Sequence, residues 1–203
     1  FGQRKIGVMP FPGADFNYVA LNNKPLYLQL CLDQSYHPEG FYTFPSDEFM
    51  KNEIMISKKL GLNGNRIHIK VEVPRKLYWA DKLGLLIMAD TPNFWGKPVP
   101  EARQDWENCM RGQVERDFNH PSVILAGFLN ECASNKKSCK ELVDKLIAAI
   151  KAEDAGRLVT FACNGWYRDI CHSNTDVGAF NTYPGTIPNQ PGLPDELAEK
   201  VRN

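Results

Sequence analysis

The sequence has no long hydrophobic run and no excess of charge of either sign. No apolar stretch among its 203 residues approaches the ~18 residues that a membrane-spanning helix requires. Lysine plus arginine and aspartate plus glutamate both total 24, so the formal net charge is zero. This balance argues against a general nucleic-acid-binding protein and against a protein that docks on membranes through a polybasic surface. We therefore expect neither nucleic acid nor a membrane among the partners.

Motifs that hold cofactors are also missing. None of the six cysteines forms a C-x-x-C pair, which gives zinc or iron–sulfur binding little support. The sequence contains no G-x-G-x-x-G and no phosphate-binding P-loop. We expect no metal and no cofactor, and we expect the cysteines to be mostly buried free thiols. Their spacing leaves the compartment open between cytoplasmic, periplasmic and extracellular.

What is present is enough material for one sizeable domain, with 43% hydrophobic and 24% charged residues. We expect no signal peptide in these residues, and the first of them, F-G-Q-R-K-I, lack an initiator methionine. They read like the middle of a longer protein. Because no interior stretch looks like a linker, we expect residues 1–203 to form a single domain, with residues 1–24 as a lead-in.

Apolar runs alternate with amphipathic segments from about residue 26 onward. The apolar runs predict six strands, at 25–32, 66–69, 85–89, 123–129, 158–162 and 177–180. Helical spacing and capping residues predict helices at 46–60, 74–83 and 101–118, a helix that starts with a capping box at Ser138, and a last helix at 195–201. Strands that are apolar on both faces and separated by helices indicate parallel β–α units.

Polar residues stand repeatedly at the carboxyl ends of these strands: Asp33, His68, Asp90, Asn130 with Glu131, Asn164, and Asn181 with Tyr183. In a (β/α)8 barrel, those ends form one rim that carries the chemistry. A doubly wound sheet would instead bind its ligand at a glycine-rich first turn, which is missing here. We therefore predict the α/β class and a (β/α)8 TIM barrel, with only about six of the eight β–α units present. The alternative for any single residue is that it merely caps a helix or a loop.

Glu131 is the strongest catalytic candidate. It follows a seven-residue apolar run, and a carboxyl at a desolvated edge suits a general acid because desolvation raises the pKa of a carboxyl. Asn130 offers an amide that could orient a hydroxyl. His68 is expected to share one strand face with Arg66 and Lys70 and to act as a hydrogen-bond donor rather than as a metal ligand.

Four stretches of the sequence are similar to those of a known enzyme family. They are the opening residues 1–6, N-N-K-P-L at 22–26, N-G-N-R-I-H at 63–68 followed by D-K-L-G-L-L at 81–86, and N-H-P-S-V at 119–123 leading to Asn130 and Glu131. On these stretches the chain resembles the catalytic barrel domain of glycoside hydrolase family 2, which includes β-galactosidases, β-glucuronidases and β-mannosidases. The resemblance implies that residues 1–24 lead in from a preceding β-sandwich and that the partners are a carbohydrate substrate and the remaining domains of a larger chain.

The resemblance also implies roles for single residues. Glu131 matches the general acid/base of a retaining enzyme that acts on β-linked glycosides, and Asn130 matches the residue that binds the sugar 2-hydroxyl. Three rim residues match positions that contact the sugar: His68, Asp90 and Asp33. Tyr183, in N-T-Y at 181–183, matches a tyrosine that supports the nucleophile, and the flat face of Trp166 suits a sugar platform.

Two departures from the family pattern set the limits of the prediction. Ala126 stands where the family has a tryptophan, and the family's nucleophile is a glutamate at the end of strand seven, which the 203 residues do not reach. Retaining chemistry needs two carboxyl groups ~5–5.5 Å apart. We therefore expect the nucleophile beyond residue 203, and we expect the 203-residue chain alone to be inactive. Unpaired edges on its first and last strands predict association of copies, as in a homo-oligomer.

Two alternatives remain beside a glycosidase of this family. One is a non-catalytic carbohydrate-binding barrel remnant, which keeps the aromatic side chains of the rim, such as Trp166 and Tyr183, but has lost the catalytic chemistry. The other is a different barrel glycosidase family with the same Asn–Glu pair, against which the opening residues argue.

Overall fold

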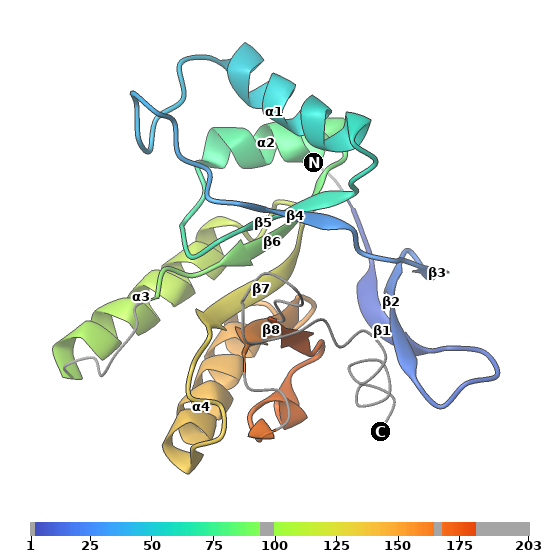
Figure 1. Cartoon of the computed structure of the whole chain (residues 1–203), viewed down its shortest axis with the longest axis vertical. Helices are drawn as coiled ribbons and strands as arrows, with labels where there is room; N and C mark the ends of the chain where they lie inside the picture. Colours follow the sequence, from blue (N-terminus) through green and yellow to red (C-terminus); the bar gives the residue numbers. More distant parts are fainter. Residues whose placement is uncertain (1–2, 94–99, 165–167, 182–203) are drawn as a thin grey trace, which may run out of the picture.

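The computed structural model describes residues 3–93, 100–164 and 168–181, and within them the chain forms two sheets (Figure 1). The smaller is antiparallel and contains β1 (Ile6–Pro10), β2 (Asn17–Leu21) and β3 (Lys24–Pro25). The larger is parallel and follows chain order: β4 (Leu30–Asp33), β5 (Gly64–Ile67), β6 (Leu86–Asp90), β7 (Val123–Asn130), β8 (Leu158–Cys163) and β9 (Ala179–Phe180).

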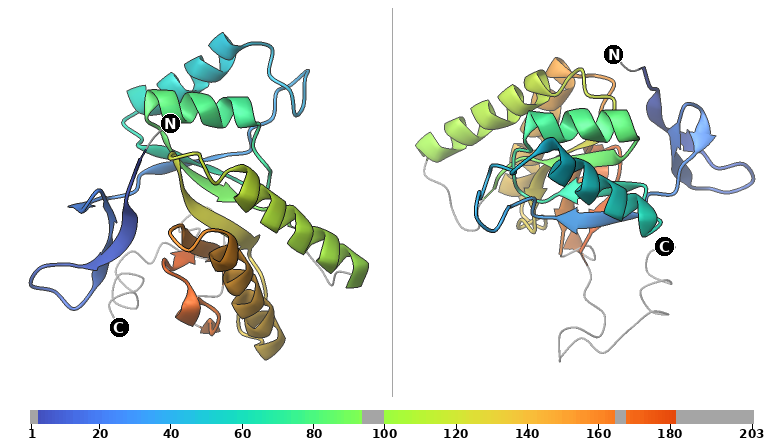
Figure 2. Two further views of the ribbon diagram at one scale, coloured as in Figure 1. Left: turned by 180° about the vertical axis from the view of Figure 1, so that it is seen from behind. Right: turned by 90° about the horizontal axis from the view of Figure 1, so that it is seen from above.

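Four helices connect the parallel strands: α1 (Asp47–Lys59), α2 (Pro74–Leu83), α3 (Pro100–Arg116) and α4 (Lys137–Glu153), with a 3-10 turn, η2 (His172–Asn174), before β9. The curved sheet carries these helices on its outer side (Figure 2). Six parallel strands in sequential order, each of the first five followed by a helical segment, make a partial (β/α)8 barrel, which confirms the predicted fold class. None of the helices in the described ranges combines the length and apolar character needed to cross a bilayer.

Strand alternation decides which side chains face the helices and which face the interior of the partial barrel. In β6, Ile87 and Ala89 pack against residues of α1 and α2, whereas Met88 packs on the inner face with Leu30 and Leu158. The next residue with the inward orientation is Asp90, at the carboxyl end of the strand. A strand that is apolar on both faces therefore ends in an inward polar group.

The small sheet closes the amino-terminal end of the parallel strands. Ile6 of β1 is buried against Ile124 and Leu158, and this burial contributes about 2 kcal/mol. Arg4 donates hydrogen bonds to the carbonyl oxygens of Pro121 and Val123, at 3.0 and 2.9 Å, where β7 begins. The opposite, carboxyl end of β7 therefore stays uncovered by this sheet.

Local signals located two helix boundaries correctly. Ser46 caps α1, with its Oγ accepting a hydrogen bond from the Phe49 backbone at 3.1 Å. Gly84 ends α2 in the left-handed conformation, at φ 68°, which glycine adopts without steric cost. The capping box predicted at Ser138 is wrong: the N-cap of α4 is Lys136, two residues earlier, and no side chain caps the helix.

Three predicted strands differ from the observed ones by two residues or more, and the one predicted at 177–180 begins only at Ala179. The run 25–32 becomes part of the parallel sheet only from Leu30, because the Leu26 backbone still bonds to Val19 of the small sheet. The strand predicted at 66–69 ends at Ile67, and Ile69 has a positive φ of 45°. That turn breaks the alternation, so Lys70 does not share a strand face with Arg66. The last predicted helix, 195–201, lies outside the described residues.

Candidate active site

Glu131 emerges from the carboxyl end of β7 in a conformation that non-glycine residues rarely adopt. Its φ is 52°, which costs about 1 kcal/mol for an L-residue. The Glu131 backbone N–H still bonds to the Ala162 carbonyl of β8 at 2.8 Å, so the turn begins within the sheet. The side chain is half-buried, and its Oε1 accepts a hydrogen bond from Asn181 Nδ2 at 2.9 Å.

Asn181 and Glu131 belong to a larger set of bonded residues at the same end of the sheet. We name it the rim network: Arg66, Asp90, Asn130, Glu131 and Asn181. Arg66 Nη2 donates to Asn130 Oδ1 at 3.0 Å, and Asn181 Nδ2 lies 3.4 Å from the same oxygen. Residues at the ends of β5, β6, β7 and β9 are therefore joined, as the rim of a barrel requires.

Asp90 anchors the rim network from inside the protein. Its Oδ2 accepts from Arg66 Nε at 2.9 Å and lies 2.7 Å from Arg66 Nη2. Burial raises the pKa of Asp90 above its ordinary value of 3.8, although the Arg66 charge opposes this. Its Oδ1 packs so closely on β7 that a Cβ added to Gly127 would lie 2.0 Å away. With 0% of the residue exposed, Asp90 holds Arg66 and presents no surface to solvent.

His68 stands in the turn that follows β5 and is half-buried. The Gln34 side-chain amide nitrogen lies 3.0 Å from His68 Nδ1. An amide NH₂ only donates, so in this arrangement Nδ1 accepts and Nε2 is the ring nitrogen that donates. The ring also acts electrostatically on Asp90, so it lies near the rim network. The structure therefore places His68 at the rim, with a donor nitrogen.

Asp33 has a different set of partners. Its carboxylate accepts from the Ser35 backbone at 2.7 Å and forms an ion pair with Lys76 of α2 at 3.2 Å. Alternation in β4 explains this orientation, because Leu30 packs in the interior and Asp33, three residues later, faces the helices. The structure thus turns the Asp33 carboxylate toward α2 rather than into the rim network.

The sequence prediction missed how two rim residues are used. The sequence predicts Arg66 on one strand face with His68, free to pair with a neighbouring carboxylate, and Asn181 at a strand end. It does not predict the bonds that join Arg66 to Asn130, and Asn181 to Asn130 and Glu131. Neighbouring parallel strands end at one edge of the sheet. A residue of β5 that faces inward near that edge, as Arg66 does, could therefore have been expected beside Asp90 and Asn130. The remaining two predicted site residues, Trp166 and Tyr183, lie outside the described residues.

The chain matches known proteins along most of its length. Residues 15–200 match the family model described as "Glycosyl hydrolases family 2, TIM barrel domain". A β-glucuronidase from Chlorocebus aethiops is 27% identical over 172 residues, which cover 80% of this chain and 26% of the relative.

Two solved structures extend the likeness to the fold. A family 2 β-galacturonidase from Eisenbergiella tayi, solved with galacturonate, superposes with a TM-score of 0.84 at 24% identity and covers 98% of this chain and 35% of its own. A β-glucuronidase from Ruminococcus gnavus, in complex with D-glucuronic acid, has a TM-score of 0.82 at 25% identity and covers 98% and 34%. The chain thus spans about a quarter to a third of the length of these relatives. It belongs to glycosyl hydrolase family 2, and its parallel sheet is part of that family's TIM barrel domain.

Proposed function

We propose that this chain carries the acid/base half of the active site of a retaining β-glycosidase, with Glu131 as the general acid/base. The observation that carries the proposal is the rim network, which fixes the Glu131 carboxyl at the carboxyl end of β7 through the 2.9 Å bond from Asn181. A general acid must be held within hydrogen-bond reach of the departing oxygen, so a fixed position is the first requirement.

Asn130 would position the sugar beside Glu131. Its Oδ1 accepts the bonds from Arg66 and Asn181, so Nδ2 is the atom with which it would donate to a sugar 2-hydroxyl. In a retaining mechanism such a bond strengthens as the transition state forms, because the sugar ring becomes oxocarbenium-like. Arg66 then acts as a positioning residue that holds the amide in this orientation.

The nucleophile must be a second carboxylate that is able to reach the anomeric carbon. In the described part of the rim network, the other carboxylate is Asp90, which is fully buried and bound to Arg66. A carboxylate in that state is unsuited to attack. We therefore propose that the nucleophile comes from chain that follows residue 203, and that the whole enzyme acts on β-linked glycosides. The relatives named for glucuronides and galacturonides make uronides the first substrates to test.

The test compares the 203-residue chain with the same chain extended through the rest of its open reading frame. We expect the extended protein to hydrolyse 4-nitrophenyl β-glucuronide or β-galacturonide, and the 203-residue chain to be inactive. In the extended protein, Glu131→Ala should lose activity on this substrate and keep a rapid first step on a dinitrophenyl glycoside, whose leaving group needs no proton. Added azide should then restore turnover by giving a β-glycosyl azide.

The matched control is Glu115→Gln, an exposed carboxylate on α3 that should leave both rates unchanged. Normal turnover by Glu131→Ala on the nitrophenyl substrate would overturn the acid/base assignment. An extended protein that binds uronides without hydrolysing any β-glycoside would support the non-catalytic carbohydrate-binding alternative instead.

A further inference from the structure

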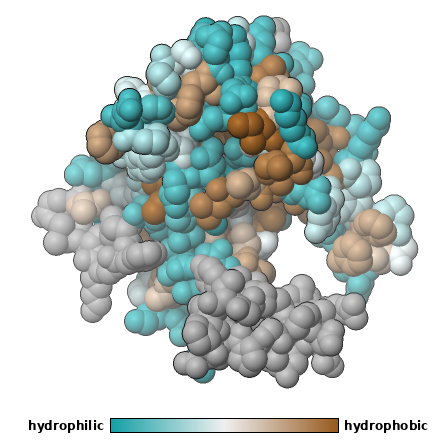
Figure 3. Space-filling view, turned by 45° about the horizontal axis from the view of Figure 1, so that its top comes forward, coloured by the Kyte–Doolittle hydropathy of each residue, from teal (hydrophilic) through white to brown (hydrophobic). Residues whose placement is uncertain are grey.

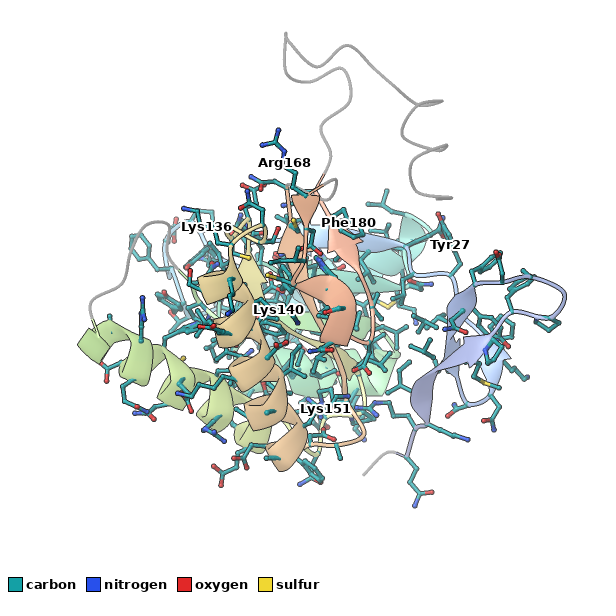
Figure 4. The ribbon with its side chains drawn as sticks, turned by 90° about the horizontal axis from the view of Figure 1, so that it is seen from below. Tyr27, Lys136, Lys140, Lys151, Arg168 and Phe180 are labelled. Carbon is teal, nitrogen blue, oxygen red and sulfur yellow. The ribbon has the colours of Figure 1, made fainter. Side chains whose placement is uncertain are left out.

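Four cysteines that the proposed chemistry does not use share one apolar cluster, and the first of them is the residue after Glu131. Cys132 follows Glu131, Cys139 lies in the first turn of α4, Cys163 ends β8, and Cys171 precedes η2. All four pack in or against one apolar cluster between β7, β8, α3 and α4. Figure 4 shows the first turn of α4, marked by Lys136 and Lys140, at the same end of the molecule as Arg168 and far from Lys151.

The four thiols differ in what surrounds them. Cys163 and Cys171 are completely buried, and both interact with Ser134: its Oγ lies 2.8 Å from Cys163 Sγ, and its carbonyl accepts from Cys171 Sγ at 3.1 Å. Cys132 and Cys139 are half-buried. A reagent arriving from solvent therefore meets Cys132 and Cys139 first. The expectation of mostly buried cysteines is wrong, since Cys31 and Cys109 are exposed, but none of the six, all within the described ranges, is in a disulfide.

The Cys132 and Cys171 thiols both interact with Cys139 at the edge of this cluster. The interaction with Cys132 lowers the pKa of Cys139 to about 7, against the opposing effect of burial. The same interaction, together with burial, raises the pKa of Cys132. Burial raises the pKa of Cys171 to about 12. One half-exposed thiol is thus activated and its neighbours are not, which is the asymmetry of a reactive pair.

We propose that Cys139 and Cys132 are a reversible modification site for low-molecular-weight disulfides such as oxidised glutathione. The Cys139 thiolate attacks one sulfur of the small disulfide, forming a mixed disulfide and releasing one glutathione thiol. Cys132 gives up its proton and attacks Cys139 Sγ, which forms the Cys132–Cys139 disulfide and releases the second glutathione. Two protein thiols are oxidised, one small disulfide is reduced to two thiols, and no other oxidant is required.

The geometry favours an intramolecular product over a lasting glutathione adduct. Because both thiols pack against the same apolar cluster, the second step joins two neighbouring groups, and the disulfide closes only the short loop between residues 132 and 139. That loop starts one residue after Glu131. Cys31 is exposed and lies outside the apolar cluster, so it would stop at the mixed disulfide and serves as an internal comparison.

The experiment incubates the 203-residue chain with oxidised glutathione at pH 7.5, blocks residual thiols by alkylation and measures intact mass and tryptic peptides. Trypsin separates the two cysteines, with Cys132 in peptide 117–136 and Cys139 in peptide 138–140. We expect these peptides to be joined by a disulfide, with loss of two hydrogens and full reversal by dithiothreitol, while Cys31 carries glutathione. The Cys132→Ser variant should instead retain one glutathione on Cys139.

A Cys139→Ser variant is expected to lose the cross-link and to leave Cys132 unmodified, because the attacking thiol is gone. A Cys109→Ser variant, which removes an exposed thiol outside the cluster, should leave the cross-link unchanged. The proposal is overturned by a wild-type chain in which Cys132 and Cys139 stay unlinked while Cys31 is glutathionylated. A Cys139→Ser variant that carries glutathione on Cys132, together with a Cys132→Ser variant that carries none on Cys139, would equally overturn it.

Discussion

Asn181 Nδ2 lies 2.9 Å from Glu131 Oε1 and so joins the end of the last described strand to the end of β7, 50 residues earlier in the chain. Glu131 leaves β7 in a left-handed conformation, at φ 52°, which directs the chain away from the strand. The bond from Asn181 therefore helps to fix the position of the Glu131 side chain, which lies beyond the regular part of β7. The position of the proposed acid depends on the sixth strand as well as on its own.

Replacing Asn181 with alanine should lower the kcat of the extended enzyme by about ten- to a hundredfold, because a small displacement of a catalytic group has effects of this size. KM should change less, since Asn181 is argued to act through Glu131. Steady-state kinetics on a nitrophenyl glycoside would measure both constants. Asn174→Ala, which removes an exposed amide bonded to Asp144, provides the control. An unchanged kcat in Asn181→Ala would show that Glu131 is held by other groups.

The stability of the fold should depend strongly on the ion pair between Arg66 and Asp90. Arg66→Met leaves a buried carboxylate without its cation and should reduce the free energy of unfolding by about 3–5 kcal/mol. Adding Asp90→Asn should recover part of this loss, so the double variant should be more stable than the sum of the single variants predicts. Urea unfolding of the four proteins measures the coupling. Strictly additive effects would mean that the two side chains do not stabilise each other.

Much of this arrangement could be predicted from local signals. The six parallel strands follow from short apolar runs, and α1 and α2 follow from Ser46, Pro74 and Gly84, because caps and breakers act within one turn. Glu131 and Asn130 could be identified because they directly follow a long apolar run. Each of these predictions needed only neighbouring residues.

The remaining features depend on contacts that the linear sequence does not contain. Ile69 has an apolar, β-branched side chain that is typical of strands, yet its positive φ turns the chain out of β5. The alternation of strand faces therefore does not extend to Lys70. Asp33 is drawn toward Lys76, 43 residues later, and faces the helices. The apolar run starts at Pro25, but the strand starts only at Leu30. Residue type alone therefore does not show which face of the sheet a residue at the strand end occupies.

Gly127 is expected to tolerate no side chain. A Cβ at this position would lie 2.0 Å from Asp90 Oδ1, and the buried ion pair leaves that oxygen little room to move. Gly127→Ala should therefore destabilise the fold by about 1–3 kcal/mol, as overpacking does. Gly112→Ala, in the interior of α3 with open space around the new methyl group, should stabilise it by about 0.5–1 kcal/mol. Thermal melts of both variants test the contrast, and equal effects would contradict it.

Asp81 makes stability depend on pH at the acid end. Although burial opposes it, hydrogen bonds from His120 at 2.6 Å and the Ser122 backbone at 2.9 Å hold the pKa of Asp81 below its ordinary value of 3.8. A carboxyl whose pKa is lowered on folding contributes stability above the unfolded pKa and loses it as pH falls through the folded value.

Asp81→Asn should therefore be less stable than wild type by about 2 kcal/mol at pH 7, with the difference shrinking below about pH 4. Urea midpoints across this range provide the measurement. Asp105→Asn, which changes an exposed carboxylate on α3, should show no such dependence. A difference between Asp81→Asn and wild type that stays constant down to pH 3 would rule out the ionised carboxylate as its source.

The edges of the parallel sheet should make the 203-residue chain associate. Within the described residues, β4 and β9 each have a neighbour on one side, and a strand edge with unpaired backbone groups is a template for another chain. Large apolar side chains are exposed on these edge strands, with Leu32 of β4 at 51% and Phe180 of β9 at 44%. Figure 3 shows hydrophobic side chains gathered near the middle of one face of the molecule. Light scattering should therefore give a mass that rises with concentration. Leu32→Lys places a charge on the edge strand and should lower that mass, because association would bury the lysine. A wild-type chain that stays monomeric at all concentrations would show that the edges are protected.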